Sequence, residues 1–334
     1  MNPAELCRLL AYTFYVALLA GCTAPVTATN EAQVVVERDS ASFIVIGDWG
    51  NYGNSHQRAV AAQMNRLASS HPVDFIVSTG DNIYDKGVQD VDDPLFGKAF
   101  EDVYTLEHLV RLDWYLVLGN HDYQGNYRAQ IDYSGVNPRW RLPATYHSLV
   151  LRFGGGHDAV LLFTDTNAFS RYYRNHPEKY LGVDQQDTDA QLRWAKQTLA
   201  RRADADWRLV IGHHPVYSSG RHAGAQQDLH ALVRLMERYD VRAYFAGHDH
   251  DLQHLKPPGS IDYFISGAGS KLRPTGTSEH TLFAESRRGF AYVTLQPTSM
   301  TVEFIGVDGT VLYRTTVAQG EPVPAPRAAS WIGE

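Results

Sequence analysis

The sequence predicts an α/β fold in which apolar strands alternate with amphipathic helices. Five strand-like runs each lead into a Gly that is followed at once by a polar residue able to bind a metal. Helical segments lie between strand candidates, which is typical of layered α/β domains. After Pro257 the runs become short and are separated by turn residues, which predicts antiparallel strands of a second sheet.

The five runs are expected to be buried strands, because they are nearly continuous in apolar residues. They begin at Phe43, Phe75, Trp114, Leu209 and Tyr244. The Gly at the end of each run permits a sharp turn. Because α/β sheets place their sites at the carboxyl ends of strands, we expect the five ends to lie side by side in one cleft.

Three helices are predicted from apolar residues at helical spacing. They cover residues 56–70, 189–201 and 228–239, and each lies between two strand candidates. In the carboxy-terminal part, strand candidates begin at Tyr263, Phe290, Met300 and Val311. Asp308 and Gly309 form a hairpin signal between the last two of these strands.

The composition is that of an ordinary globular protein with an acidic balance. The chain has 334 residues and a formal net charge of -7, and hydrophobic residues make up 44% of it. This length is sufficient to bury a core. The charge argues against a nucleic-acid partner, because a phosphate backbone requires a basic face.

Both cysteines, Cys7 and Cys22, lie in the first 22 residues, so the main body has neither a disulfide nor a cysteine nucleophile. Arg8 precedes an apolar run from Leu9 to Ala20, which matches a signal-peptide core and is short for a membrane span. The run ends in Leu-Ala-Gly-Cys22, which resembles the lipobox of bacterial lipoproteins, where the cysteine is lipidated. An ordinary cleaved signal and an uncleaved anchor are the alternatives.

These features divide the chain into four parts. They are a signal peptide over residues 1–22, a flexible tether over 23–40, a folded domain over 41–318 and a Pro-rich tail over 319–334. We expect an exported bacterial monomer that contacts a membrane only through lipidated Cys22. It would face the periplasm or lie at the cell surface.

The donors at and near the strand ends are too many for one metal ion. They are Asp48, Asp81, Tyr84, Asn120, His213, His248 and His250. A tetrahedral zinc site needs four ligands at most, whereas a bridging carboxylate lets this set hold two ions. Carboxylate and phenolate oxygens suit a hard trivalent ion, and amide and imidazole groups suit a divalent one. The sequence therefore favours an asymmetric, mixed-valence pair.

The motifs around these donors resemble, in order and spacing, the five motifs of purple acid phosphatases. They are Asp-Trp-Gly, Gly-Asp-Asn-Ile-Tyr, Gly-Asn-His-Asp, Val-Ile-Gly-His and Gly-His-Asp-His. The resemblance is to the small, tartrate-resistant type within the calcineurin-like metallophosphoesterases, and it extends from about residue 42 to 317. It implies the metallophosphoesterase fold, a four-layer αββα sandwich of two mixed β-sheets flanked by helices.

The resemblance also implies a role for each donor. The ferric ion would be held by Asp48, Tyr84 and His250, and Asp81 would bridge the two metals. The divalent ion, which is Fe(II), Zn or Mn in this interpretation, would be held by Asn120, His213 and His248. Tyr84 is the discriminating residue, because other metallophosphoesterases generally lack a tyrosinate ligand and this ligand gives the family its colour.

Two further histidines, His121 and His222, resemble the outer-sphere pair of the family. Beside a dinuclear centre they would contact phosphate and protonate the leaving alkoxide. His222 is alternatively a plain loop histidine. The resemblance implies hydrolysis of small phosphomonoesters by a metal-bound hydroxide, because two cations lower the pKa of a bound water. Protonated histidines would tilt the pH optimum towards acid.

Three supporting residues and one loop complete the prediction. His214 and Asp165 are expected to support the site by packing, and Asp122 either orients an imidazole or caps a turn. The segment from Asn167 to Tyr180, where the family carries a loop over the site, is basic and aromatic here. It favours anionic or planar substrates, or it is a solvated loop.

Three other functions remain open from the sequence. A phosphodiesterase or nucleotidase would use the same metals on different esters. An iron-based surface protein that generates reactive oxygen would need no outer-sphere histidines. A lipid-anchored binding module would not need all seven donors.

Overall fold

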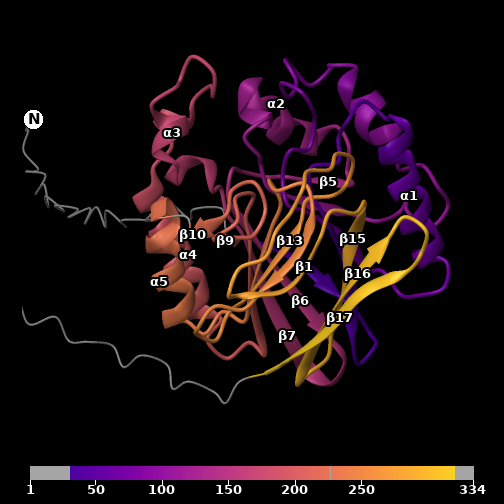
Figure 1. Cartoon of the computed structure of the whole chain (residues 1–334), viewed down its shortest axis with the longest axis vertical. Helices are drawn as coiled ribbons and strands as arrows, with labels where there is room; N and C mark the ends of the chain where they lie inside the picture. The colour runs from indigo at the N-terminus through magenta and orange to yellow at the C-terminus, as the bar shows by residue number, and fades with distance from the viewer. Residues whose placement is uncertain (1–30, 226, 320–334) are drawn as a thin grey trace, which may run out of the picture.

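The computed structural model describes residues 31–225 and 227–319, which form two β-sheets packed face to face with helices outside them (Figure 1). The predicted signal peptide (1–22), the first part of the predicted tether and residues 320–334 of the predicted tail lie outside the described residues. Within the described ranges, no helix is both long enough and apolar enough to cross a membrane.

The first sheet has eight strands and is mixed. Its order is β1 (Glu31–Val35), β6 (His147–Phe153), β7 (His157–Phe163), β8 (Trp207–Ile211), β11 (Ala243–Ala246), β13 (Asp262–Ser266), β12 (Leu252–Leu255) and β14 (Thr281–Glu285). Strands β7, β8, β11 and β13 run parallel to one another, while β6 and β12 pair antiparallel with their neighbours β7 and β13.

The second sheet has seven strands and is also mixed. Its order is β17 (Val311–Ala318), β16 (Ser299–Gly306), β15 (Gly289–Leu295), β2 (Ala41–Ile46), β3 (Phe75–Ser78), β4 (Trp114–Leu116) and β5 (Trp140–Arg141). The four strands β2 to β5 are parallel, and the three C-terminal strands add an antiparallel half. A short ribbon of β9 (Tyr217–Ser218) and β10 (Gly224–Ala225) lies outside both sheets.

The three predicted helices are confirmed with small shifts at their ends. They are α1 (Ser55–Ala68), α4 (Thr188–Arg201) and α5 (His230–Arg238), and two shorter helices are α2 (Tyr127–Asp132) and α3 (Arg171–Arg174). Helix α1 begins where Asn54 accepts the backbone N–H of Gln57, and α4 begins where Asp187 accepts that of Ala190.

Three separate apolar layers show that the fold has four layers of secondary structure. Side chains from the inner faces of both sheets meet in the middle, where the rings of Phe43 and Phe75 stack at 4.9 Å. Helix α1 packs on the outer face of the seven-stranded sheet through residues such as Met64. Helices α4 and α5 cover the outer face of the other sheet through residues such as Leu199 and Met236. The predicted αββα sandwich is confirmed.

Two details of the predicted organisation are wrong. Residues 31–35 form edge strand β1 instead of a flexible tether, because Ala32 and Val34 alternate onto the central core and the strand pairs with β6. The strand that begins near Tyr263 does not join the C-terminal antiparallel group. It is β13 of the eight-stranded sheet, where it pairs parallel with β11.

Candidate metal centre

The seven predicted donors come together, but the five strands that deliver them belong to two sheets. Strands β2, β3 and β4 of the seven-stranded sheet lead into Asp48, Asp81, Tyr84 and Asn120. Strands β8 and β11 of the eight-stranded sheet lead into His213, His248 and His250. The five strand ends share one cleft, as predicted, and this cleft lies where the carboxyl ends of strands from both sheets meet.

One group of donors surrounds the hydroxyl of Tyr84. This oxygen lies 2.9 Å from Asp48 Oδ1, 3.0 Å from Asp81 Oδ2 and 3.2 Å from His250 Nε2. Asp48 Oδ1 and His250 Nε2 are themselves 3.2 Å apart. All four side chains are buried. Their metal-binding atoms therefore converge on one point that a cation can occupy.

A second group of donors surrounds Nε2 of His213. This atom lies 3.1 Å from Asn120 Oδ1, 3.2 Å from His248 Nδ1 and 3.5 Å from Asp81 Oδ1. The other ring nitrogen of His213 lies 2.9 Å from the carbonyl oxygen of Thr79, which can only accept a hydrogen bond, so Nε2 is the ring nitrogen that faces the other donors. Asp81 directs one oxygen to each group, which is the geometry that a bridging carboxylate needs.

The electrostatics of the two groups fit cations. Burial, with the charge of Asp81, raises the pKa of Asp48 to about 7 and that of Tyr84 well above its ordinary value. Burial lowers the pKa of His250 to about 3 and that of His248 well below its ordinary value, so both imidazoles are neutral and able to ligate. Positive ions would stabilise the anionic oxygens that burial disfavours.

The backbone is adapted to bring the donors together. Asp48, Asp81 and His248 have positive φ angles of 57°, 52° and 67°, which residues other than Gly rarely adopt. A Cβ on Gly119 would collide with Asp81, so this Gly provides room for the close approach of two loops. At Asp48 and His248 the sharp turn expected at the preceding Gly thus lies at the ligand itself, whereas at Asp81 the preceding Gly80 also has a positive φ of 93°. Such strain is common at functional sites.

Asp122 holds two of the ligand loops in register. Its buried carboxylate accepts hydrogen bonds from the backbone N–H of Gly119 at 2.7 Å, Asn82 at 3.1 Å and Ile83 at 3.2 Å, and from Gln130 Nε2 at 2.8 Å. None of its described hydrogen bonds involves an imidazole, so the first of the two predicted roles is wrong. Sequence reasoning missed Gln130, which no motif identifies.

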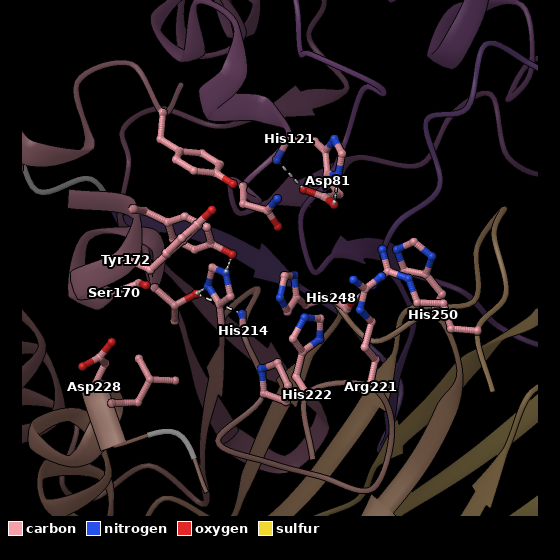
Figure 2. A pocket seen from close by; sticks show the side chains of 17 residues that line it. Asp81, His121, Ser170, Tyr172, His214, Arg221, His222, Asp228, His248 and His250 are labelled. Carbon is pink, nitrogen blue, oxygen red and sulfur yellow. Dashed lines mark hydrogen bonds and ion pairs between the residues drawn. The ribbon is translucent and has the colours of Figure 1, made fainter. Parts of the chain in front are cut away.

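The two predicted outer-sphere histidines line the cavity above the donors (Figure 2). The backbone N–H of His121 donates to Asp81 Oδ1 at 2.9 Å, and its ring packs against the Tyr84 ring. His222 stacks on the His248 ring with centroids 4.0 Å apart, and its Nδ1 lies 2.8 Å from Asp249 Oδ1.

Asp249 is a positioning residue that sequence reasoning missed. It lies between the ligand histidines in Gly-His-Asp-His, which was the available signal. Burial acts to raise its pKa, but hydrogen bonds from His222 and Ser218 hold that pKa below its ordinary value. An ionised Asp249 orients the His222 ring through this contact.

The residues predicted to support the site lie around it. His214 contacts the Thr166 hydroxyl at 2.9 Å through Nδ1 and the Tyr173 hydroxyl at 3.1 Å through Nε2. Its ring is close enough to His213 and His248 to be a third imidazole of a metal group, but both ring nitrogens already have protein partners. Asp165 is buried and accepts the Tyr123 hydroxyl at 2.6 Å.

A cavity of about 450 Å³ is lined by the two outer-sphere histidines and by four of the donors, namely Asp81, Asn120, His248 and His250. Arg221 and Arg273 also line it, and Arg273 Nη1 donates to the His248 carbonyl oxygen at 3.2 Å. Neither arginine was predicted. A cavity with metal donors at one end, two outer-sphere histidines and two guanidinium groups is suited to an anionic ligand.

Known proteins are similar to this chain in sequence and in fold. Residues 41–252 match the calcineurin-like phosphoesterase family. The chain is 35% identical over 293 residues to tartrate-resistant acid phosphatase type 5 of Homo sapiens, covering 82% of this chain and 89% of that protein. It is 34% identical over 300 residues to purple acid phosphatase 7 of Arabidopsis thaliana, covering 84% and 87%.

Solved structures agree with this placement. GAP50, described as the anchor in the inner membrane complex of Plasmodium, superposes with a TM-score of 0.74 at 26% identity over 84% of this chain and 90% of its own. Purple acid phosphatase PPD1 from yellow lupin seeds has a TM-score of 0.59 at 14% identity over 84% of this chain and 54% of its own, which shows the shared fold alone.

Proposed function

We propose that this chain, which belongs to the calcineurin-like phosphoesterase family, is a metal-dependent acid phosphatase of the purple acid phosphatase type. The observation that best supports this is the pair of donor groups that share Asp81 at the floor of a cavity lined by histidines and arginines. The substrates are small phosphomonoesters.

We further propose that the centre holds Fe(III) with a divalent partner. The group of Asp48, Tyr84 and His250 supplies the hard, anionic oxygens that suit a trivalent ion. The group of Asn120, His213 and His248 offers neutral donors that suit Fe(II), Zn or Mn. When bound, the pair supplies a nucleophilic water of lowered pKa and neutralises the charge of the phosphate.

The side chains around the centre do the remaining chemistry. His121 lines the cavity beside Asp81 and is placed to donate a proton to the leaving oxygen. His222, held by Asp249, and the two arginines are placed to bind phosphate oxygens. No covalent intermediate is required, which agrees with the absence of cysteine from residues 23–334.

Steady-state kinetics test the reaction class. We expect a higher kcat/KM for p-nitrophenyl phosphate than for bis(p-nitrophenyl) phosphate, with an optimum at acidic pH. A preference for the diester would favour the phosphodiesterase alternative. Metal-dependent formation of reactive oxygen without ester hydrolysis would favour the redox alternative.

The amino terminus supports a separate proposal on location. We propose that the mature chain begins at lipidated Cys22, is exported, and faces the periplasm or the cell surface as a monomer. Export and lipidation are proposed from the apolar run Leu9 to Ala20 and from the Leu-Ala-Gly-Cys22 sequence that ends it. Mass spectrometry of membrane fractions should find a lipidated Cys22, and Cys22→Ser should release or misprocess the protein. An intact Met1 would contradict it.

A further inference from the structure

The cavity continues beyond the metal donors to an aromatic end. Figure 2 shows Asp81, His248 and His250 away from Tyr172 and Asp228, with His214 between the two ends. The cavity volume of about 450 Å³ is within the range of sites that enclose whole small molecules. A phosphate group at the metal donors would therefore leave the second end for the rest of the substrate.

The aromatic end is built around Tyr172 of helix α3. This side chain is 55% exposed, although it is large and apolar. Its ring lies 4.4 Å from the His176 ring and 5.5 Å from the Tyr173 ring, and both Tyr173 and Tyr180 are buried behind it. An exposed aromatic ring that lines a cavity and is backed by other rings is suited to stack on a ligand.

The position of this aromatic end of the cavity is fixed before any ligand binds. The Tyr173 hydroxyl lies 3.1 Å from Nε2 of His214, beside the metal donors. At the other end of α3, Arg171 donates to Asp228 through its backbone N–H and its Nε, each at 3.1 Å. Because both ends of the helix are held, little conformational freedom is lost when a ligand stacks on Tyr172.

The chemistry of the two ends differs. Pro215 and Leu229 line the cavity with Tyr172, and the charge of Asp228 is paired with Arg171. Arg221 lies beside His250 and His222 in Figure 2, at the phosphate end. The phosphate end is therefore cationic, and the Tyr172 end is aromatic and apolar.

We propose that the Tyr172 end is the leaving-group subsite and selects phosphomonoesters whose alcohol is a planar aromatic ring over those of small aliphatic alcohols. This inference rests on the proposed phosphatase function and specifies its substrate class. Tyr172 is a specificity-determining residue in this account and has no part in ligating metal or moving protons.

The test compares phenyl phosphate with glycerol 2-phosphate. For Tyr172→Ala, we expect kcat/KM for phenyl phosphate to fall roughly three- to tenfold, the range that one aromatic contact contributes, while that for glycerol 2-phosphate is unchanged. Tyr172→Phe keeps the ring and should behave as the wild type. Leu282→Ala, which removes an exposed side chain on β14 outside the cavity, is the control and should change neither value.

Because each comparison uses the same two esters, the intrinsic difference between their leaving groups cancels. An equal loss for both esters, or no loss for phenyl phosphate in Tyr172→Ala, would overturn the subsite. Binding of phenylphosphonate and methylphosphonate to the metal-loaded protein separates the subsite from the reaction. If the wild type hydrolyses neither ester but Tyr172→Ala weakens only phenylphosphonate, the subsite stands and the phosphatase proposal fails.

Discussion

The two sheets contribute different chemistry to the centre. The seven-stranded sheet delivers only oxygen donors, namely Asp48, Asp81, Tyr84 and Asn120, whereas the eight-stranded sheet delivers only imidazoles, namely His213, His248 and His250. Neither sheet alone supplies a complete set for either group of donors, since each group combines oxygens and imidazoles. The metal centre therefore depends on the packing of the two sheets as much as on the motifs themselves.

The two sheets also differ in the charge of the donors that they contribute. On the oxygen side, burial raises the pKa of Asp48 to about 7 and that of Tyr84 well above its ordinary value, so this side is unfavourable without cations. On the imidazole side, burial keeps His248 neutral by lowering its pKa. Cations that bind both sides would join the sheets and stabilise the folded state.

The largest effect should come from Asp81, which contacts both sides. Asp81→Ala removes the only carboxylate that faces both donor groups in the described structure, so both metals and all phosphatase activity should be lost together. Metal analysis alongside kinetics provides the measurement. Retention of two equivalents of metal by the purified variant would refute the bridging role.

His121 lies on the oxygen side but is not proposed as a ligand, so its removal should separate activity from metal content. We expect His121→Ala to keep both metals and to lose about 10²–10⁴-fold in kcat, the usual contribution of general acid catalysis. The loss should be smallest for esters with good leaving groups. A loss of metal as complete as in Asp81→Ala would mean that His121 is a ligand after all.

His147 belongs to the eight-stranded sheet and contacts the other sheet through a hydrogen bond that involves no metal. Its Nε2 lies 2.9 Å from the Leu116 carbonyl oxygen of β4, and its Nδ1 has no hydrogen-bond partner in the described residues. Burial lowers its pKa from 6.5 to about 4, so the unfolded chain takes up a proton at a higher pH than the folded one. The free energy of unfolding should therefore fall as the pH drops from 6.5 to about 4.

This loss amounts to at most roughly 3 to 4 kcal/mol, since each unit of pKa difference corresponds to about 1.4 kcal/mol. His147→Gln cannot take up this proton, so urea unfolding at pH 7 and pH 4.5 should show a smaller acid loss than in the wild type. Exposed His71→Gln is the control. An acid loss in His147→Gln equal to that of the wild type would contradict the assignment.

The smallest expected effect concerns Lys271, whose Nζ lies 3.6 Å from the centroid of the Tyr84 ring. A cation over this ring stabilises the phenolate. With ferric iron bound as proposed, Lys271→Met should make Tyr84 a better electron donor and move the charge-transfer band to longer wavelength, with metal content unchanged. A band at the wild-type position, or at shorter wavelength, would rule out this influence.

Much of this centre is predictable from the sequence, because each strand end is a local pattern of apolar residues, Gly and a donor. The division of the strands between two sheets is not, since nothing local distinguishes the run before Asp48 from the run before His213. The role of Asp122 also depends on distant partners such as Gln130. Strand β1 was missed because a short edge strand with partly exposed residues resembles a linker.

The central claim is that Tyr84 and its neighbours hold ferric iron beside a divalent ion. The most direct test is the metal content and visible spectrum of the purified protein and of Tyr84→Phe. We predict one iron and one divalent metal per chain, with a broad visible band that Tyr84→Phe abolishes. A colourless wild-type protein that contains two zinc ions and no iron would contradict the account.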